Sequence, residues 1–114
     1  MFHQTIEHLY NPFICLKNLH KHLKDGGYLF TSVPTINIPH LVPFHFNGYT
    51  PMGLCMLMMS CGFNIKELGF WGNEDYINYI FKNNKWPDYK ELMKNGLIKN
   101  EKNKEAQCWI LVQK

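Results

Sequence analysis

The sequence predicts an α/β fold built around one buried strand that follows a helix and a tight turn. Residues 28–33 are rich in β-branched and aromatic side chains and carry no charge, which is typical of a strand covered on both faces. Gly26 and Gly27 precede this strand and can close a helix in the left-handed conformation. Pro34 ends the strand where an α/β sheet opens its ligand crevice. Together these features are the pattern of an α/β enzyme.

Composition limits the possible functions of the 114 residues, which suffice for one domain. All twelve basic residues are Lys, and the absence of Arg argues against a nucleic-acid reader. No apolar run reaches the roughly 18 residues of a membrane span, and Met1 opens into polar residues instead of a secretory leader. We therefore expect a cytoplasmic protein with neither a nucleic-acid nor a membrane partner. We expect the four cysteines to be reduced and packed as small apolar groups: Cys15, Cys55, Cys61 and Cys108.

Residues 1–24 indicate a strand end, a loop and then a helix. Residues 1–10 begin without a polar cap or turn, which suggests that the natural domain starts earlier. Asn11 followed by Pro12 is a helix start, with an Asn cap and Pro at the first helical position. Leu16, Leu19 and Leu23 then fall on one stripe at helical spacing. This helix is expected to lie on the sheet with its lysines in water.

A loop and a second helix follow the buried strand. Residues 35–49 form a long loop with two Pro and two His, and loops of this length in a compact domain are usually functional. Thr50 and Pro51 start a helix by the same device of cap and proline. Residues 52–59 are apolar almost all round, so this helix should be buried, with its methionines filling the core, and Gly62 should end it.

The last third of the chain is predicted to contain two strands separated by an excursion. Residues 63–68 alternate as a short strand, and residues 69–75 are expected to form a turn with two large aromatic side chains. Residues 76–81 and 88–94 are predicted short helices, and Asn95 with Gly96 closes the second. Residues 106–112 alternate as a final strand, and we expect that strand to pair antiparallel with residues 63–68.

In this order and spacing, the elements resemble the C-terminal half of a class I S-adenosylmethionine-dependent methyltransferase of the type 11 branch. The resemblance covers most of residues 2–68 together with 106–113. Its motifs are residues 4–9 (QTIEHL) after the family's fourth strand, 23–27 (LKDGG) before the fifth, 32–34 (SVP) at its exit, 49–51 (YTP) and 61–63 (CGF). It implies a Rossmann-like sheet with parallel central strands and an antiparallel last strand at the sheet edge. Residues 1–114 would then be a partial methyltransferase domain, the acceptor-side half.

The cofactor-binding strands of this family are absent from the 114 residues. The family holds S-adenosylmethionine with a glycine-rich turn after its first strand and an acidic residue ending its second. No such turn occurs here, since Gly69 and Gly72 flank two aromatic residues and do not lead from a strand into a helix. We infer a fragment, a mis-called gene start or a degenerate copy. By itself the chain is expected to be inactive and to bind S-adenosylmethionine weakly or not at all.

The resemblance places candidate site residues in two segments. His3, Gln4 and Thr5 fall where the family's chain passes the methionine end of the cofactor, and a surface loop is the alternative interpretation. Glu7 and His8 match the family signature. His8 is a candidate substrate contact, although the pair could equally brace the loop against the following helix.

The long loop supplies the candidate catalytic residues His40 and His45, because a neutral imidazole can remove a proton from an acceptor hydroxyl. His45 is favoured, since its two phenylalanine neighbours would screen it from water. Substrate-binding candidates are Tyr49, Phe70 and Trp71, for which packing under the loop is the alternative. No metal site is predicted, because His40, His45 and Cys61 lack the paired spacing of structural zinc sites.

Two functions therefore stay open from the sequence. The first is S-adenosylmethionine-dependent methyl transfer to a small-molecule, sugar or lipid-like acceptor. The alternative is a non-catalytic binding or structural module derived from a methyltransferase half-domain. In either case the loss of the first three strands would bare the edge of the strand at residues 1–5, through which the chain could associate with itself.

Overall fold

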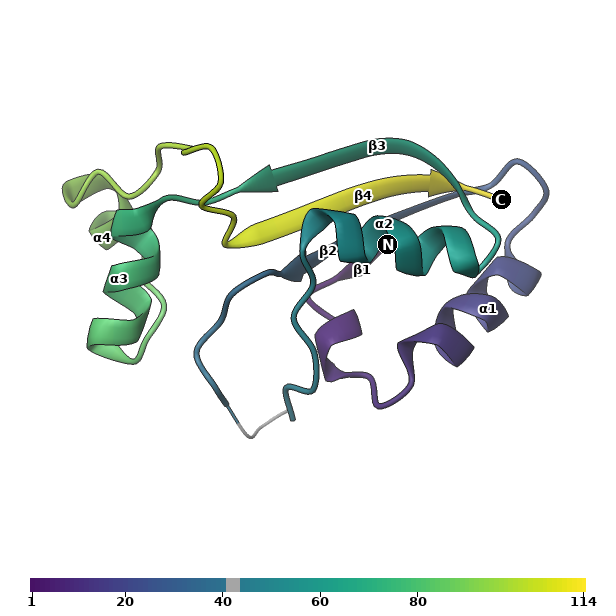
Figure 1. Ribbon diagram of the computed structural model, residues 1–114, viewed down its shortest axis with the longest axis horizontal. Helices are drawn as coiled ribbons and strands as arrows, with labels where there is room; N and C mark the ends of the chain where they lie inside the picture. The colour runs from purple at the N-terminus through teal and green to yellow at the C-terminus, as the bar shows by residue number, and fades with distance from the viewer. Residues whose placement is uncertain (41–43) are drawn as a thin grey trace.

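A computed structural model of the chain describes residues 1–40 and 44–114. Residues 41–43, within the long loop predicted at 35–49, lie outside the described residues. The strands are β1 (Phe2–His3), β2 (Tyr28–Pro34), β3 (Asn64–Trp71) and β4 (Gln107–Gln113). The α-helices are α1 (Pro12–His22), α2 (Pro51–Ser60), α3 (Glu74–Asn83) and α4 (Tyr89–Lys94), and a short 3₁₀ helix, η1, covers Ile6–His8. Figure 1 shows the arrangement.

The four strands form one mixed sheet in the order β1-β2-β4-β3. Strand β1 runs parallel to β2, and β4 pairs antiparallel with both β2 and β3. The predicted pairing of the last two strands and the central position of β2 are both confirmed. The last strand is not at the edge, however, because β4 is hydrogen-bonded on both sides along its length. The two edge strands are β1 and β3, and β3 is protected by exposed charges at Lys66 and Glu67 and by a bulge between Ile65 and Glu67.

The helix boundaries follow the predicted caps. The Asn11 side chain accepts a hydrogen bond from the Ile14 amide at 3.1 Å, and Thr50 Oγ1 accepts one from the Gly53 amide at 3.0 Å. Gly26 closes the turn before β2 with a φ of +76°. These local signals placed both helices correctly, because each cap satisfies amide groups that the helix itself leaves unpaired.

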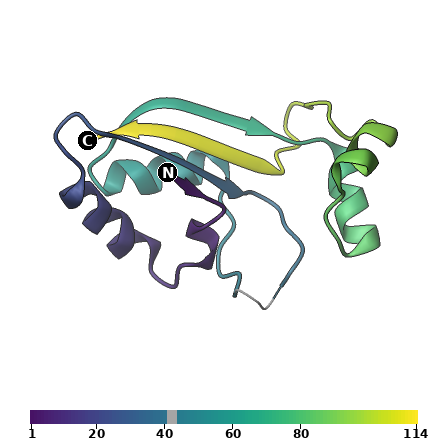
Figure 2. The ribbon, with the colours of Figure 1, turned by 180° about the vertical axis from the view of Figure 1, so that it is seen from behind.

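Helices α1 and α2 pack on the same face of the sheet. Viewed from behind, the strands lie in front of α2, and α1 lies beside and below them (Figure 2). Their shared core contains side chains of every strand and of both helices, so it joins the first and last parts of the chain. The fully buried apolar members are Ile6, Leu16, Val33, Leu54, Met58, Cys108, Ile110 and Val112.

Helix α2 is not buried all round, contrary to the prediction from its composition. Leu54 and Met58 are fully buried against the sheet, whereas Met52, Met56 and Met59 are 67%, 58% and 54% exposed. The reason is that α2 packs chiefly on β3 and β4 through one side, while the side that carries these three methionines is exposed to solvent. The prediction from composition therefore overestimated the burial of α2, because only one face of this apolar helix is packed.

Residues 72–105 leave the sheet as an excursion that carries α3 and α4 at one end of the molecule (Figure 1). Strand β3 extends through Trp71, so residues 69–71 are strand and the predicted turn at 69–75 is wrong in that part. Gly72 marks the point of departure, and a Cβ there would come within 2.1 Å of the Lys104 carbonyl oxygen. The two ends of the excursion therefore lie in backbone contact, and only glycine fits between them.

Candidate functional site

A cavity of about 560 Å³ opens at the end of the sheet where β1 and β2 finish. It collects polar and aromatic side chains from four separated stretches: the residues after β1, the long loop, the excursion and the start of β4. In chain order the lining residues are His3, Gln4, Glu7, His8, Asn37, His40, Trp86 and Gln107. The carboxyl ends of neighbouring parallel strands are where open α/β sheets bind ligands.

The backbone of Gln4 turns sharply where the chain leaves β1 at the cavity. The residue has a φ of +48°, in the left-handed region that residues other than glycine seldom adopt. Its amide donates to the Ser32 carbonyl oxygen at 2.9 Å, and its side-chain Nε2 donates to Gln107 Oε1 at 2.6 Å. The strained backbone is thus held by bonds to β2 and β4, as strain at functional sites usually is.

The long loop is tied to the segment of η1 by several hydrogen bonds. The amides of Phe46 and Asn47 donate to the Glu7 carbonyl oxygen at 2.8 and 3.2 Å. Asn47 Nδ2 donates to the Leu9 carbonyl oxygen at 3.3 Å, and His8 Nδ1 bonds to the Phe44 carbonyl oxygen at 2.9 Å. Glu7, through its backbone carbonyl, and His8, through its ring, therefore hold the long loop, which is a different contact from the bracing against the following helix that the sequence left open.

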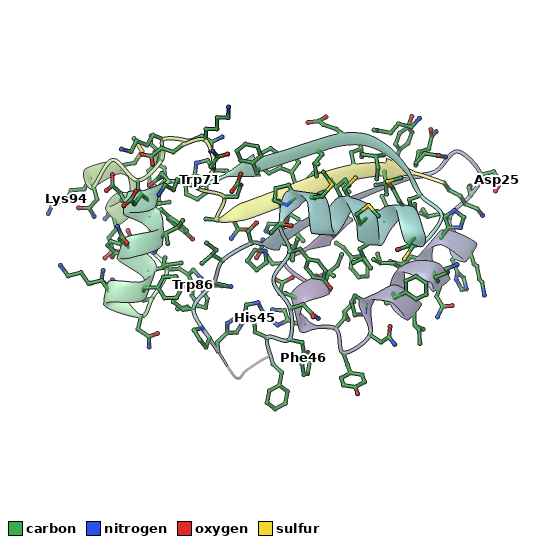
Figure 3. All side chains as sticks on the ribbon, viewed as in Figure 1. Asp25, His45, Phe46, Trp71, Trp86 and Lys94 are labelled. Atoms are coloured by element: carbon green, nitrogen blue, oxygen red, sulfur yellow. The ribbon has the colours of Figure 1, made fainter. Side chains whose placement is uncertain are left out.

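Three histidine rings meet where these two segments join. The ring centroids of His40 and His45 are stacked 4.9 Å apart, and both rings contact His8, at 5.3 and 6.0 Å. The His40 ring also meets the Trp86 ring edge to face, with the two centroids 5.5 Å apart. In Figure 3, Trp86 lies at the side of the excursion that faces the loop carrying His45. His40 therefore packs against three rings, those of His8, His45 and Trp86.

Backbone carbonyls fix which nitrogen of each ring carries a proton. A carbonyl oxygen only accepts hydrogen bonds, so the nitrogen facing it must be the N–H donor. His40 Nδ1 faces the Ile38 carbonyl oxygen at 3.1 Å, and His45 Nε2 faces that of Asn47 at 2.9 Å. His8 Nδ1 is likewise bonded to Phe44. In the neutral rings, His8 Nε2, His40 Nε2 and His45 Nδ1 then carry lone pairs.

Glu7 is a buried acid beside these rings. The residue is 1% exposed, and its Oε2 has no hydrogen-bond partner among the described residues. Its Oε1 lies 3.7 Å from His8 Nε2, too far for a hydrogen bond. Burial raises the pKa of Glu7 because it penalises the charged form, while a backbone hydrogen bond and the nearby histidines partly offset that rise. A perturbed acid in a cavity is typical of a functional site.

The structure brings some of the predicted site residues together. His3, Gln4, His8 and His40 line the cavity, and His45 stacks behind His40. Thr5 instead donates its hydroxyl to the His3 carbonyl oxygen at 2.9 Å.

The remaining predicted residues lie elsewhere. Tyr49 and Phe70 pack against the core under the sheet, Trp71 packs in the excursion, and none of the three lines the cavity. The proposed screening of His45 is wrong, since Phe44 and Phe46 are 62% and 51% exposed and point into solvent.

Sequence reasoning missed three lining residues, Asn37, Trp86 and Gln107, and did not identify Glu7 as a buried acid. Gln107 could have been found from strand register, because it lies opposite Pro34 at the end of β2. Trp86 donates its Nε1 proton to Asn37 Oδ1 at 2.7 Å. No local pattern could have placed that contact, because it depends on how the whole excursion folds back.

The described residues show neither a metal-binding cluster nor a membrane-spanning helix. Within residues 1–40 and 44–114, no three His, Cys, Asp or Glu side chains are arranged to hold a metal ion. In the same residues no helix has the length and apolar character needed to cross a bilayer.

Comparisons with known proteins agree on the fold. A methyltransferase from Archaeoglobus fulgidus, described as dependent on S-adenosylmethionine, matches with a TM-score of 0.58 and 18% identity, over 100% of this chain and 57% of its own. One from Mesorhizobium loti, described likewise, matches with a TM-score of 0.61 and 10% identity, over 98% of this chain and 59% of its own. No family model and no curated relative matches the sequence. The chain therefore has the α/β fold of the matching part of these methyltransferases and spans less than two thirds of their length.

Proposed function

We propose that this chain is the acceptor-side half of a class I methyltransferase of the type 11 branch, acting on a small molecule in the cytoplasm. The observation that carries the proposal is the cavity at the carboxyl ends of β1 and β2, which His40 lines while its Nδ1 is bonded to the Ile38 carbonyl oxygen. The fold of the structural neighbours supports the same reaction class. Sugars and lipid-like molecules are further acceptor classes that we consider.

The 114 residues fit the cofactor only in part. His3, Gln4 and Thr5 are proposed to approach its methionine end, and two of them line the cavity. A glycine-rich turn between a strand and a helix is missing from the sequence, so the adenosine half has no cradle in this chain. We therefore assign no reaction step to the cofactor and limit the proposal to what these residues do to an acceptor.

His40 is the proposed general base. Methyl transfer is an in-line displacement, so the protein has to align the acceptor and take up the proton that the acceptor loses. His40 Nδ1 is committed to the Ile38 carbonyl oxygen, which leaves Nε2 free to receive that proton. Our sequence-based preference for His45 is replaced, because His45 lies behind His40 and does not line the cavity.

A non-catalytic module is the second candidate function. The three exposed methionines of α2 favour it, because a methionine-rich surface is suited to binding partners of variable shape. Under this alternative, the histidine cluster serves to hold the long loop in place.

The coding DNA upstream of Met1 tests the proposal. An in-frame strand and glycine-rich turn would support it, and the longer product should then transfer a labelled methyl group. In that product His40→Phe should lower kcat about 100-fold or more, the usual contribution of a general base. The matched control His22→Phe changes an exposed histidine on α1 and should leave kcat unchanged. A longer product without the turn, or full activity in His40→Phe, would overturn the proposal.

A further inference from the structure

The corner of the cavity formed by Glu7, His8 and His40 presents hydrogen-bond acceptors and no donors. Each histidine uses its N–H on a backbone carbonyl, His8 on Phe44 and His40 on Ile38. Their remaining nitrogens carry lone pairs in the neutral rings, and Glu7 adds a carboxylate. A ligand that hydrogen-bonds to all three side chains must therefore carry the hydrogen-bond donors itself.

Glu7 is the group in this corner that most needs a hydrogen-bond donor. It is 1% exposed, its Oε2 has no partner among residues 1–40 and 44–114, and its Oε1 lies 3.7 Å from His8 Nε2. A carboxylate and a lone-pair nitrogen that face each other at this distance repel unless a donor lies between them. Burying an unpaired carboxylate is costly, and a cationic ligand would remove that cost.

The rest of the cavity limits the ligand further. No lysine is among the described lining residues, so the cavity has no permanent cation to hold an anionic ligand. Trp86 contributes an aromatic ring beside His40, and a cation near an aromatic face is stabilised by the ring quadrupole. A metal ion is disfavoured, because the described donors do not converge on one position.

We propose that this corner binds a primary ammonium group, so that the acceptor is an amine held by Glu7 and His8. His40 Nε2 receives the third N–H and takes up that proton, which leaves the nitrogen the lone pair that bonding to a methyl group requires. An ammonium group has three donors, which matches one carboxylate and two imidazole nitrogens. This inference extends the proposed function. It depends on that function only for the claim that the bound amine receives a methyl group. The binding itself is a property of this chain and can be measured without methyl transfer.

The test is a titration of the full chain with n-propylammonium chloride, observed through the side-chain resonances of isotope-labelled histidine. Sodium chloride keeps the ionic strength constant, and n-propanol is the neutral ligand of the same shape. We expect a dissociation constant in the millimolar range, roughly that of a small ligand with few atoms. The resonances of His8 and His40 should shift, with no saturable response to propanol.

Two variants locate the site. Glu7→Gln keeps the shape and removes the charge, and it should weaken ammonium binding about tenfold or more. Glu67→Gln, on the exposed edge strand β3, is the matched control and should have no effect. His40→Phe keeps the ring stacking and removes the lone pair, and it should also weaken binding, which keeps the test open if Glu7→Gln does not fold.

Three results would overturn the inference: propanol binding as well as propylammonium, Glu7→Gln binding unchanged, or zinc chloride shifting these histidines when the ammonium does not. Failure here differs from failure of the proposed function. A longer product that methylates an alcohol while the chain binds no ammonium would refute this inference alone. A longer product that binds ammonium and transfers no methyl group would refute the proposed function alone.

Discussion

The core under the sheet and the excursion at 72–105 are stabilised in different ways. The core joins α1, α2 and the strands through fully buried apolar side chains such as Leu16, Leu54 and Ile110. The excursion has a much smaller apolar cluster and depends on the buried Asn73, whose side chain bonds to three backbone groups. The side of the cavity formed by the sheet is therefore stabilised by a large apolar core. The side that carries Trp86 is stabilised by a smaller apolar cluster and by the hydrogen bonds of Asn73.

The largest expected effect is in the core. Leu54→Ala should lower the free energy of unfolding by about 2–5 kcal/mol, because it removes a fully buried side chain and leaves a void. Urea denaturation followed by far-ultraviolet circular dichroism measures the change. Met56→Ala, on the exposed side of the same helix, is the control and should cost less than about 1 kcal/mol. Equal losses would mean that α2 is packed on both sides.

Asn73→Ala tests the polar support of the excursion. Asn73 Nδ2 donates to the Leu97 and Lys99 carbonyl oxygens at 2.7 Å each, and Oδ1 caps α3 through the Tyr76 amide. Losing these bonds should cost about 2 kcal/mol. Hydrogen exchange should accelerate in residues 74–100 and much less in β2 and β4. Uniform acceleration across the chain would contradict a separate excursion, and Asn78→Ala on the exposed side of α3 is the control.

Glu7→Gln should stabilise the chain by about 1 kcal/mol at neutral pH, because it removes a buried charge without a full set of partners. The sign follows from the raised pKa of Glu7: the folded state holds the proton more tightly, so the stabilising contribution exists at low pH and is lost as pH rises through the folded value. Stability of the Gln variant should therefore fall less than that of the unmodified chain as the pH rises above about 4.5. An unchanged slope would place Glu7 in contact with water.

The exposed methionines of α2 should give the smallest effect. Replacing Met52, Met56 and Met59 together by Gln should change the free energy of unfolding by less than about 0.5 kcal/mol per site, since all three are more than half exposed. Thermal unfolding measures it. A loss of several kcal/mol would restore the prediction that α2 is buried all round.

Local and periodic signals predicted most of the fold. The caps at Asn11 and Thr50 and the charge-free stretch before Pro34 depend on neighbouring residues only, so they could be read directly. The interior position of β4 and the one-sided packing of α2 could not, because both depend on which elements surround them.

Site residues whose position depends on local signals could be predicted, and those that depend on distant contacts could not. Residues after a strand end, such as His3 and Gln4, could be placed in the crevice by position alone. Trp86 and Asn37 meet across 49 residues of chain, and no pattern in the sequence marks that contact. Glu7 likewise bonds through its backbone carbonyl to Phe46 and Asn47, about 40 residues away, and no pattern in the sequence marks that contact or the burial of its side chain.

The tautomers of His8 and His40 test the central claim most directly, since the proposed base and the proposed ammonium site both require an unprotonated Nε2. A long-range proton–nitrogen correlation spectrum of histidine-labelled protein at about pH 8 distinguishes the two ring nitrogens. The account predicts a protonated Nδ1 and a lone pair on Nε2 in both residues, with the reverse in His45. Protonated Nε2 in His8 and His40, as in freely solvated rings, would contradict it.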